Sequence, residues 1–193
     1  MRLWHPLNAI PSGWARGLTF CCLLLLTGVI GMKAMGPFKT EQTPRGIVDF
    51  EFAGNEQNAR RVVQLWTAQG KREALRQHLW WDNLWLLCYS TTLAFACVMV
   101  GNLLRGYGSG WYALGLSLGW MQWIAGLLDL TENYALKQML GEFQGDRWPL
   151  TAWWCAAFKF ALVGVGLLYV FGGFIVCLAT ATGPPASATR SML

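Results

Sequence analysis

Four long stretches with almost no charge constrain this sequence more than any other feature. Residues 17–32, 83–104 and 106–128 contain no Asp, Glu, Lys or Arg, and between residues 148 and 189 the only charge is Lys159. A helix rises about 1.5 Å per residue, so about 20 residues cross the roughly 30 Å hydrocarbon core of a bilayer. The pattern predicts an all-α integral membrane protein with spans at about 15–36, 82–104, 109–131 and 150–178.

The composition supports this class. Hydrophobic residues make up 54% of the chain and charged residues 13%, about half the charged fraction of a soluble domain. Tryptophans gather near the predicted span ends, at Trp14, Trp80, Trp81, Trp85, Trp111, Trp148, Trp153 and Trp154, as amphipathic rings do at the headgroup level. The net charge of +5 indicates basic loops beside anionic headgroups. We therefore expect membrane lipids as partners, and no nucleic acid.

The first apolar segment has two interpretations. It can cross the membrane if the Lys33 side chain reaches toward the headgroups and the helix continues to Gly36. Alternatively, Arg2 and Arg16 followed by an apolar stretch are typical of a cleavable signal peptide, which would leave three spans. The long basic region, and Lys33 beside the would-be cleavage site, favour a retained span.

The domain organisation follows from the same pattern. We expect an N-terminal tail at 1–14, one four-span domain at 15–181 and a disordered tail at 182–193. Within the polar loop 37–81, the segment IVDFEF is strand-like. The following residues predict a helix that caps the bundle or lies in the interface, with an apolar stripe of Ala59, Val62, Val63, Leu65 and Trp66. A second helix, from about Lys71, is expected to run on into the second span.

Small residues predict how the spans pack. Gly115 and Gly119 in the third span, and Ala157 and Ala161 in the fourth, have the spacing of close helix contacts. A four-helix transmembrane bundle is the natural architecture. All six cysteines fall inside predicted spans without a CxxC pair, which favours packing roles over thiol redox chemistry.

Polar residues in the third and fourth spans form the sharpest candidate site. Asp129, Glu132 and Asn133 share one helix face at spacing i, i+3, i+4, and Gln122 lies two turns earlier. An antiparallel turn near residues 144–145 places Lys159 at about the depth of Asp129. Because a lone buried charge costs several kcal/mol, we expect Lys159 to pair with Asp129 or Glu132.

Further polar residues are expected at the same membrane face. His78 and Asp82 are spaced i, i+4, and Tyr89 follows on the same stripe. Asp49 and Glu51 alternate in the strand-like segment, so both would face the mouth of the pocket. Lys33 is a further possible member of this pocket. His78, Asp82, Asp129 and Glu132 together could suit Mg²⁺, but without signature spacing we predict no metal and no cofactor. His5 has no visible partner.

Three segments carry a resemblance. TPRGIVDFEFAG (43–54), LLDLTENYAL (127–136) and WPLTAWWCAAFKFALVGVGLLYV (148–170) resemble segments of a family of small bacterial four-span membrane proteins. The likeness covers about a third of the chain. It implies a bacterial protein, for which the expected location is the inner membrane, and it implies no activity for any residue.

Several functions remain open at this point. The sequence contains no P-loop, GxGxxG, HExxH or GxSxG motif. We expect a non-catalytic membrane protein that binds a lipid or small amphiphile, or serves as an accessory subunit beside another membrane protein or a second copy. One alternative is a lipid headgroup enzyme with Glu132 or Asp129 as general base and Lys159 stabilising negative charge. Others are a small transporter or ion path, and a polar network that only sets helix register.

Overall fold

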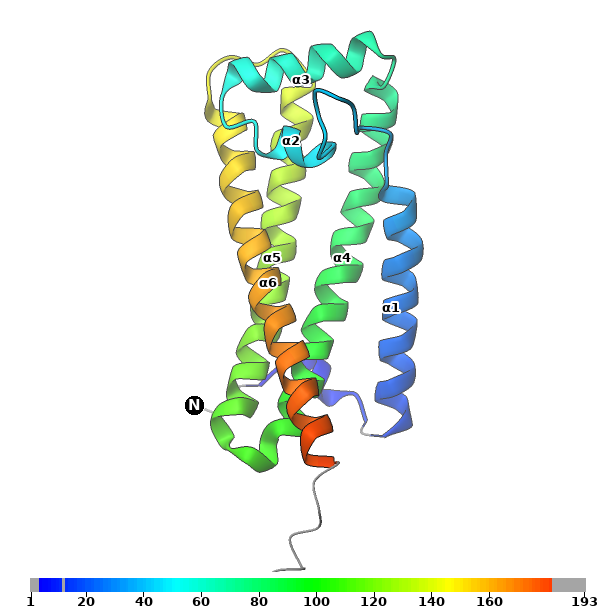
Figure 1. The fold of residues 1–193 in the computed structure, drawn as a ribbon, viewed down its shortest axis with the longest axis vertical. Coiled ribbons are helices and arrows are strands. Elements are labelled where there is room, and N and C mark those ends of the chain that lie inside the picture. The colour runs from blue at the N-terminus through cyan, green and yellow to red at the C-terminus, as the bar shows by residue number, and fades with distance from the viewer. Residues whose placement is uncertain (1–3, 12, 182–193) are drawn as a thin grey trace, which may run out of the picture.

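The fold is helical throughout the described part of the chain. The computed structural model describes residues 4–11 and 13–181, so the tail predicted to be disordered, 182–193, lies outside the described residues. Four helices are long and apolar enough to cross a membrane: α1 (Trp14–Ala34), α4 (Arg72–Leu103), α5 (Ser109–Met139) and α6 (Arg147–Ala181) (Figure 1). The predicted all-α class with four candidate spans is confirmed at this level.

α4 and α5 extend furthest beyond their predicted apolar spans. α4 begins at Arg72, because the second helix predicted in the loop continues into the span without a break. α5 continues to Met139, since Ala135, Leu136 and Met139 are fully buried among apolar residues of the loop 35–71. The extra turns carry α4 and α5 above the predicted spans and form the base on which the loop folds.

The long helices do not pack as four equivalent rods. α4, α5 and α6 pack against one another, whereas α1 packs against α4 and has no comparable contact with α5 or α6 (Figure 1). The architecture is therefore a three-helix core with α1 attached along one edge of α4. This arrangement leaves the α1-facing side of α6 without a helical neighbour.

Small residues mark the closest helix crossing. A Cβ added at Gly115 would lie 2.7 Å from the Cys97 carbonyl oxygen and 2.8 Å from the Gly101 Cα atom. The predicted contact role of Gly115 is confirmed, because only glycine permits this approach of α5 to α4. The prediction for α6 is wrong at Ala161, which is exposed. The buried face of α6 instead includes Ala152, Ala156 and Lys159.

The loop between α1 and α4 folds into a cap over one end of the bundle. It contains α2 (Ile47–Glu51) and α3 (Glu56–Ala68), and α3 lies across the ends of the long helices (Figure 1). Trp66 of α3 is buried against the rings of Phe38 and Phe50, at centroid distances of 4.9 and 5.7 Å. Of the two placements expected for the amphipathic helix, the structure shows the cap.

The strand predicted at IVDFEF is wrong, because residues 47–51 form the helix α2. Gly46 precedes it with φ of 66°, a conformation that glycine adopts readily. The Asp49 carboxylate accepts hydrogen bonds from the Arg45 backbone N–H and guanidinium. Phe50 is fully buried against Trp66. Tertiary packing of one aromatic ring thus overrides an alternation of only six residues.

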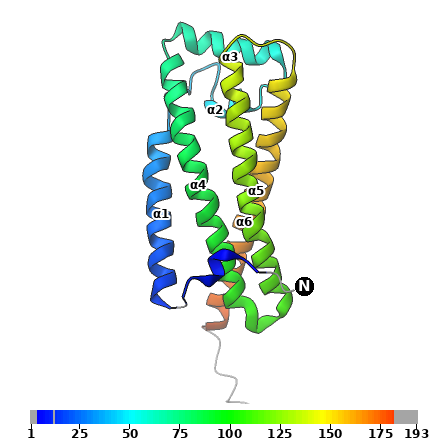
Figure 2. The same cartoon turned by 180° about the vertical axis from the view of Figure 1, so that it is seen from behind.

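The N-terminal segment folds against the opposite end of the bundle. It contains the short 3-10 helix η1 (Pro6–Ala9) and crosses α4 and α5 on the face seen in Figure 2. A second 3-10 helix, η2 (Leu104–Tyr107), forms the turn between α4 and α5 at the same end. The cap and these short helices therefore define the two ends of the molecule, called here the cap end and the turn end.

Candidate functional site

A buried ionic cluster joins α5 and α6 near the cap end. Lys159 Nζ lies 2.8 Å from Asp129 Oδ1 and 2.8 Å from Glu132 Oε2. The exposed fractions of the three side chains are 8%, 2% and 1%. The predicted contact between Lys159 and the carboxylates of α5 is therefore confirmed, and it involves both of them.

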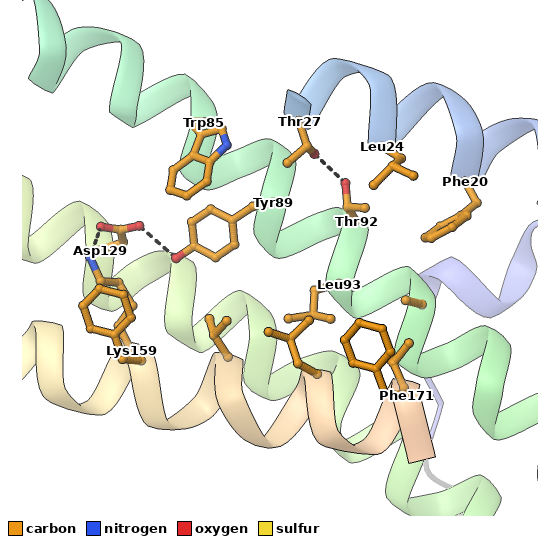
Figure 3. A pocket seen from close by; sticks show the side chains of 15 residues that line it. Phe20, Leu24, Thr27, Trp85, Tyr89, Thr92, Leu93, Asp129, Lys159 and Phe171 are labelled. Carbon is orange, nitrogen blue, oxygen red and sulfur yellow. Dashed lines mark hydrogen bonds and ion pairs between the residues drawn. The ribbon is translucent and has the colours of Figure 1, made fainter. Parts of the chain in front are cut away.

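Helix geometry explains how this contact forms. Asp129 and Glu132 are three residues apart on α5 and present both carboxylates to the same neighbouring helix. α6 runs antiparallel to α5, which brings Lys159 to their depth. α4 adds Tyr89, whose hydroxyl donates to Asp129 Oδ2 at 2.8 Å (Figure 3). Three helices are thus connected through one carboxylate.

A second polar contact lies closer to the cap. The Asn133 side-chain amide donates to Asp82 Oδ2 at 2.7 Å and to Asn83 Oδ1 at 3.2 Å. Asp82 and Asn133 therefore lie in the predicted polar region, but they pair with each other rather than with Lys159. Gln122, two turns toward the turn end, donates to the Leu162 carbonyl oxygen at 3.1 Å.

The two acids of α2 separate, contrary to the prediction that both face the pocket. In a helix, residues two apart point in different directions. Asp49 forms a 2.7 Å ion pair with Arg45. Glu51 is buried, with 7% of its surface exposed, and its electrostatic neighbours are Lys159, Asp129, Asp82 and Glu132. Only Glu51 joins the ionic cluster.

His78 does not join the cluster either. Its Nδ1 atom contacts the carbonyl oxygen of Ala34 at the end of α1, and its ring packs edge-on against Phe38 at a centroid distance of 5.2 Å. The i, i+4 spacing placed His78 and Asp82 correctly on one helix face. It did not show that α1, rather than α5, covers the upper part of that face.

The cluster contains more acidic than basic groups. Glu51, Asp129 and Glu132 surround the single ammonium group of Lys159. Glu51 Oε2 and Glu132 Oε2 are buried without a hydrogen-bond partner among the described residues, although Glu132 Oε2 lies within ion-pair distance of Lys159. Burial raises the pKa of Glu51, Lys159 opposes this rise, and Asp129 and Asp82 add to it.

A cavity of about 520 Å³ opens between α1, α4 and α6, and is called here the lateral cavity. Its walls are mostly apolar and include Phe20, Leu24, Leu93, Leu167 and Phe171. Asp129, Lys159 and Tyr89 lie together at one end of it, whereas Phe20 and Phe171 lie at the other (Figure 3). The wall of the lateral cavity is thus almost entirely apolar, and the ionic cluster borders it at the cap end.

A second cavity, called here the cap cavity, lies next to the first. It has a volume of about 900 Å³ and is bounded by the end of α1, the loop after it and the first turns of α4. Thr27 and Trp85 line both cavities. His78 and Asp82 line the cap cavity but not the lateral one.

The environment of His5 was not predicted from any sequence pattern. Its ring is fully buried, with centroids 4.9 Å from Trp120 and 4.7 Å from Trp123. Burial lowers the pKa of this imidazole. The Trp120 indole also donates to the Trp4 carbonyl oxygen at 3.0 Å. The contacts join residues more than a hundred positions apart, so no local pattern could have predicted them.

Comparisons with known proteins assign no family. No protein-family model matches the chain, and no significant match was found among curated proteins or solved structures. The ionic cluster and the two cavities are therefore the features that bear on function.

Proposed function

We propose that this protein is a bacterial inner-membrane protein that binds a lipid or another amphiphile in the lateral cavity. The carrying observation is that the wall of this cavity is almost entirely apolar and that Tyr89, Asp129 and Lys159 border it at one end. An amphiphile has the same division into an apolar chain and a polar end. Ligand sites typically combine apolar walls with a few convergent polar groups in this way.

The position of the cavity supports a ligand that arrives from the bilayer. It lies between α1 and α6, which have no substantial contact with each other. Large apolar side chains around it, including Leu24, Leu167 and Phe171, are exposed. In a membrane these side chains face acyl chains, so a lipid can enter sideways without crossing a polar barrier.

The hydrogen bonds of Asp129 argue against this residue as a general base. Both of its carboxylate oxygens accept a hydrogen bond, one from Lys159 and one from Tyr89. A general base needs a free oxygen within reach of the proton that it removes. Asp129 is therefore better suited to hold Lys159 and Tyr89 in place at the end of the cavity than to activate a nucleophile.

Tryptophan substitutions that fill the lateral cavity test this function. Leu24→Trp with Leu167→Trp places two large rings in the cavity, because both leucines line it. We expect co-purifying lipid, measured by mass spectrometry after gentle detergent extraction, to fall about tenfold, which corresponds to about 1.4 kcal/mol of binding free energy.

The matched control uses the next residue on each helix. Leu25→Trp with Leu168→Trp makes the same chemical change at exposed leucines that do not line the cavity. This control should retain the lipid. Equal lipid content in both double variants, at equal yield of folded protein, would mean that the lateral cavity is not the binding site.

A further inference from the structure

Basic residues outnumber acidic residues in the wall of the cap cavity. Lys39, Arg45 and Lys71 all line it, and the only acidic residue in its wall is Asp82. Asp82 accepts a hydrogen bond from Asn133, and Arg45 is paired with Asp49. The two lysines have no ion-pair partner among the described residues. Two uncompensated ammonium groups therefore border this space.

The cap cavity adjoins the lateral cavity. Thr27 of α1 and Trp85 of α4 line both. Trp85 in turn packs against Tyr89, at a ring-centroid distance of 4.8 Å, at the polar end of the lateral cavity. Thr27 and Trp85 are thus the side chains that the polar end of a molecule in the lateral cavity would pass to reach the lysines.

From this geometry we propose that the cap cavity binds the phosphate-bearing headgroup of an anionic lipid, with Lys39 and Lys71 as the charged contacts. The inference rests on the proposed function, since it assigns a headgroup class to the amphiphile of the lateral cavity. Ammonium groups suit phosphate as strongly hydrated point charges. A zwitterionic headgroup would bring its own cation beside both lysines, so the site discriminates against it.

The test compares two lipids that differ only in the headgroup. The full-length protein in neutral detergent is titrated with phosphatidylglycerol or phosphatidylcholine of identical acyl chains, and binding is measured by native mass spectrometry. The wild-type protein should bind phosphatidylglycerol more tightly. The double variant Lys39→Gln/Lys71→Gln should lose about 25-fold in affinity for phosphatidylglycerol, because each cation contributes a factor of about five, and it should bind the two lipids about equally.

The matched control removes two other cations from the cap end. Lys33 and Lys137 are exposed and do not line the cap cavity. The double variant Lys33→Gln/Lys137→Gln therefore has the same net charge as the test variant, and it should keep the preference for phosphatidylglycerol. Inorganic phosphate, added as a competitor, should displace little lipid, because it lacks the chain that occupies the lateral cavity.

The outcomes separate this inference from the proposed function. Equal binding of both lipids by the wild-type protein, or equal losses in the two double variants, overturns the anionic headgroup site while lipid binding stands. If inorganic phosphate displaces the bound lipid efficiently, the cap cavity is a site for free phosphate and not for a lipid headgroup. Absence of binding for both lipids, together with unchanged lipid content in the cavity-filling variant, overturns the proposed function itself.

Discussion

At the scale of single residues, Lys159 has the most consequential position. It is the only cation in a buried cluster with Glu51, Asp129 and Glu132. Buried charges are tolerated only when they are paired and hydrogen-bonded, and removal of one partner leaves the others without compensation. The stability of the bundle should therefore depend on this ammonium group more than on any exposed charge.

Loss of the Lys159 charge should destabilise the protein strongly. Lys159→Met keeps a long apolar stem but leaves Asp129 and Glu132 unpaired, at an expected cost of about 3–5 kcal/mol. The measurement is thermal unfolding in detergent, with the yield of monodisperse protein. Lys137→Met, at an exposed position on α5, is the control and should be nearly neutral. Equal melting temperatures for the two variants would show that the ion pair contributes nothing.

A second substitution separates a structural from a binding role. Adding Glu132→Gln to Lys159→Met removes one of the unpaired charges. Recovery of folded yield in the double variant indicates that the pair is structural, since the effects are then not additive. Loss of bound lipid at normal yield indicates instead that Lys159 contacts the ligand.

At the scale of elements, α2 links the cap to the cluster. Glu51 follows Phe50 in α2, and the charged groups around it are Lys159 of α6, Asp129 and Glu132 of α5, and Asp82 of α4. Burial raises the pKa of its carboxyl above the ordinary value. For an acid with a raised folded-state pKa, stability is fully present below the unfolded pKa and is lost as pH rises through the folded pKa. The docking of α2 should weaken as Glu51 ionises.

Glu51→Gln should remove this pH dependence. Relative to the wild-type protein, the variant should gain thermal stability as pH rises from about 5 to about 8. The measurement is the melting temperature of both proteins at several pH values. Glu56→Gln is the control, because hydrogen bonds from Arg60 and Gly145 lower the pKa of Glu56. Its effect should be constant over this range. A stability difference for Glu51→Gln that does not change with pH contradicts the inference that ionisation of Glu51 weakens the docking of α2.

At the scale of the whole molecule, the two ends differ in charge and shape. The cap end carries α2, α3 and the turn between α5 and α6, whereas the turn end carries η1 and η2 (Figures 1 and 2). All ten acidic residues lie in the cap, in the cap-end halves of α4 and α5, or in the turn between α5 and α6. If the four long helices cross the membrane, the cap and η2 face opposite compartments.

Cysteine labelling tests this topology. Gln57→Cys places a thiol on α3, and Gly106→Cys places one on η2, both at exposed positions. A membrane-impermeant maleimide applied to one side of sealed vesicles should label one variant and not the other. The wild-type protein is the control, because its six cysteines lie within the long apolar helices. Labelling of both variants from the same side would falsify the four-span topology.

The four long helices, the continuation of the loop helix into α4 and the pairing of Lys159 with Asp129 or Glu132 could be predicted from the sequence alone, whereas the contact with both carboxylates came from the structure. These features follow from strong, local constraints: a charge-free run of about 20 residues has few other uses, and a buried ammonium group requires a carboxylate at its depth. The i, i+3 spacing of Asp129 and Glu132 explains why both carboxylates lie within reach of the Lys159 ammonium group.

The conformation of α2, the partner of His78 and the lateral cavity could be seen only in the tertiary structure. Whether residues 47–51 form a strand or a helix depended on the packing of Phe50 against Trp66, and the partner of His78 depended on where α1 ends. The lateral cavity exists because α1 packs on α4 and leaves α6 uncovered. Each outcome depends on which surfaces meet across long sequence separations. Periodicity shows which face of a helix is apolar or polar, but not which neighbour covers it.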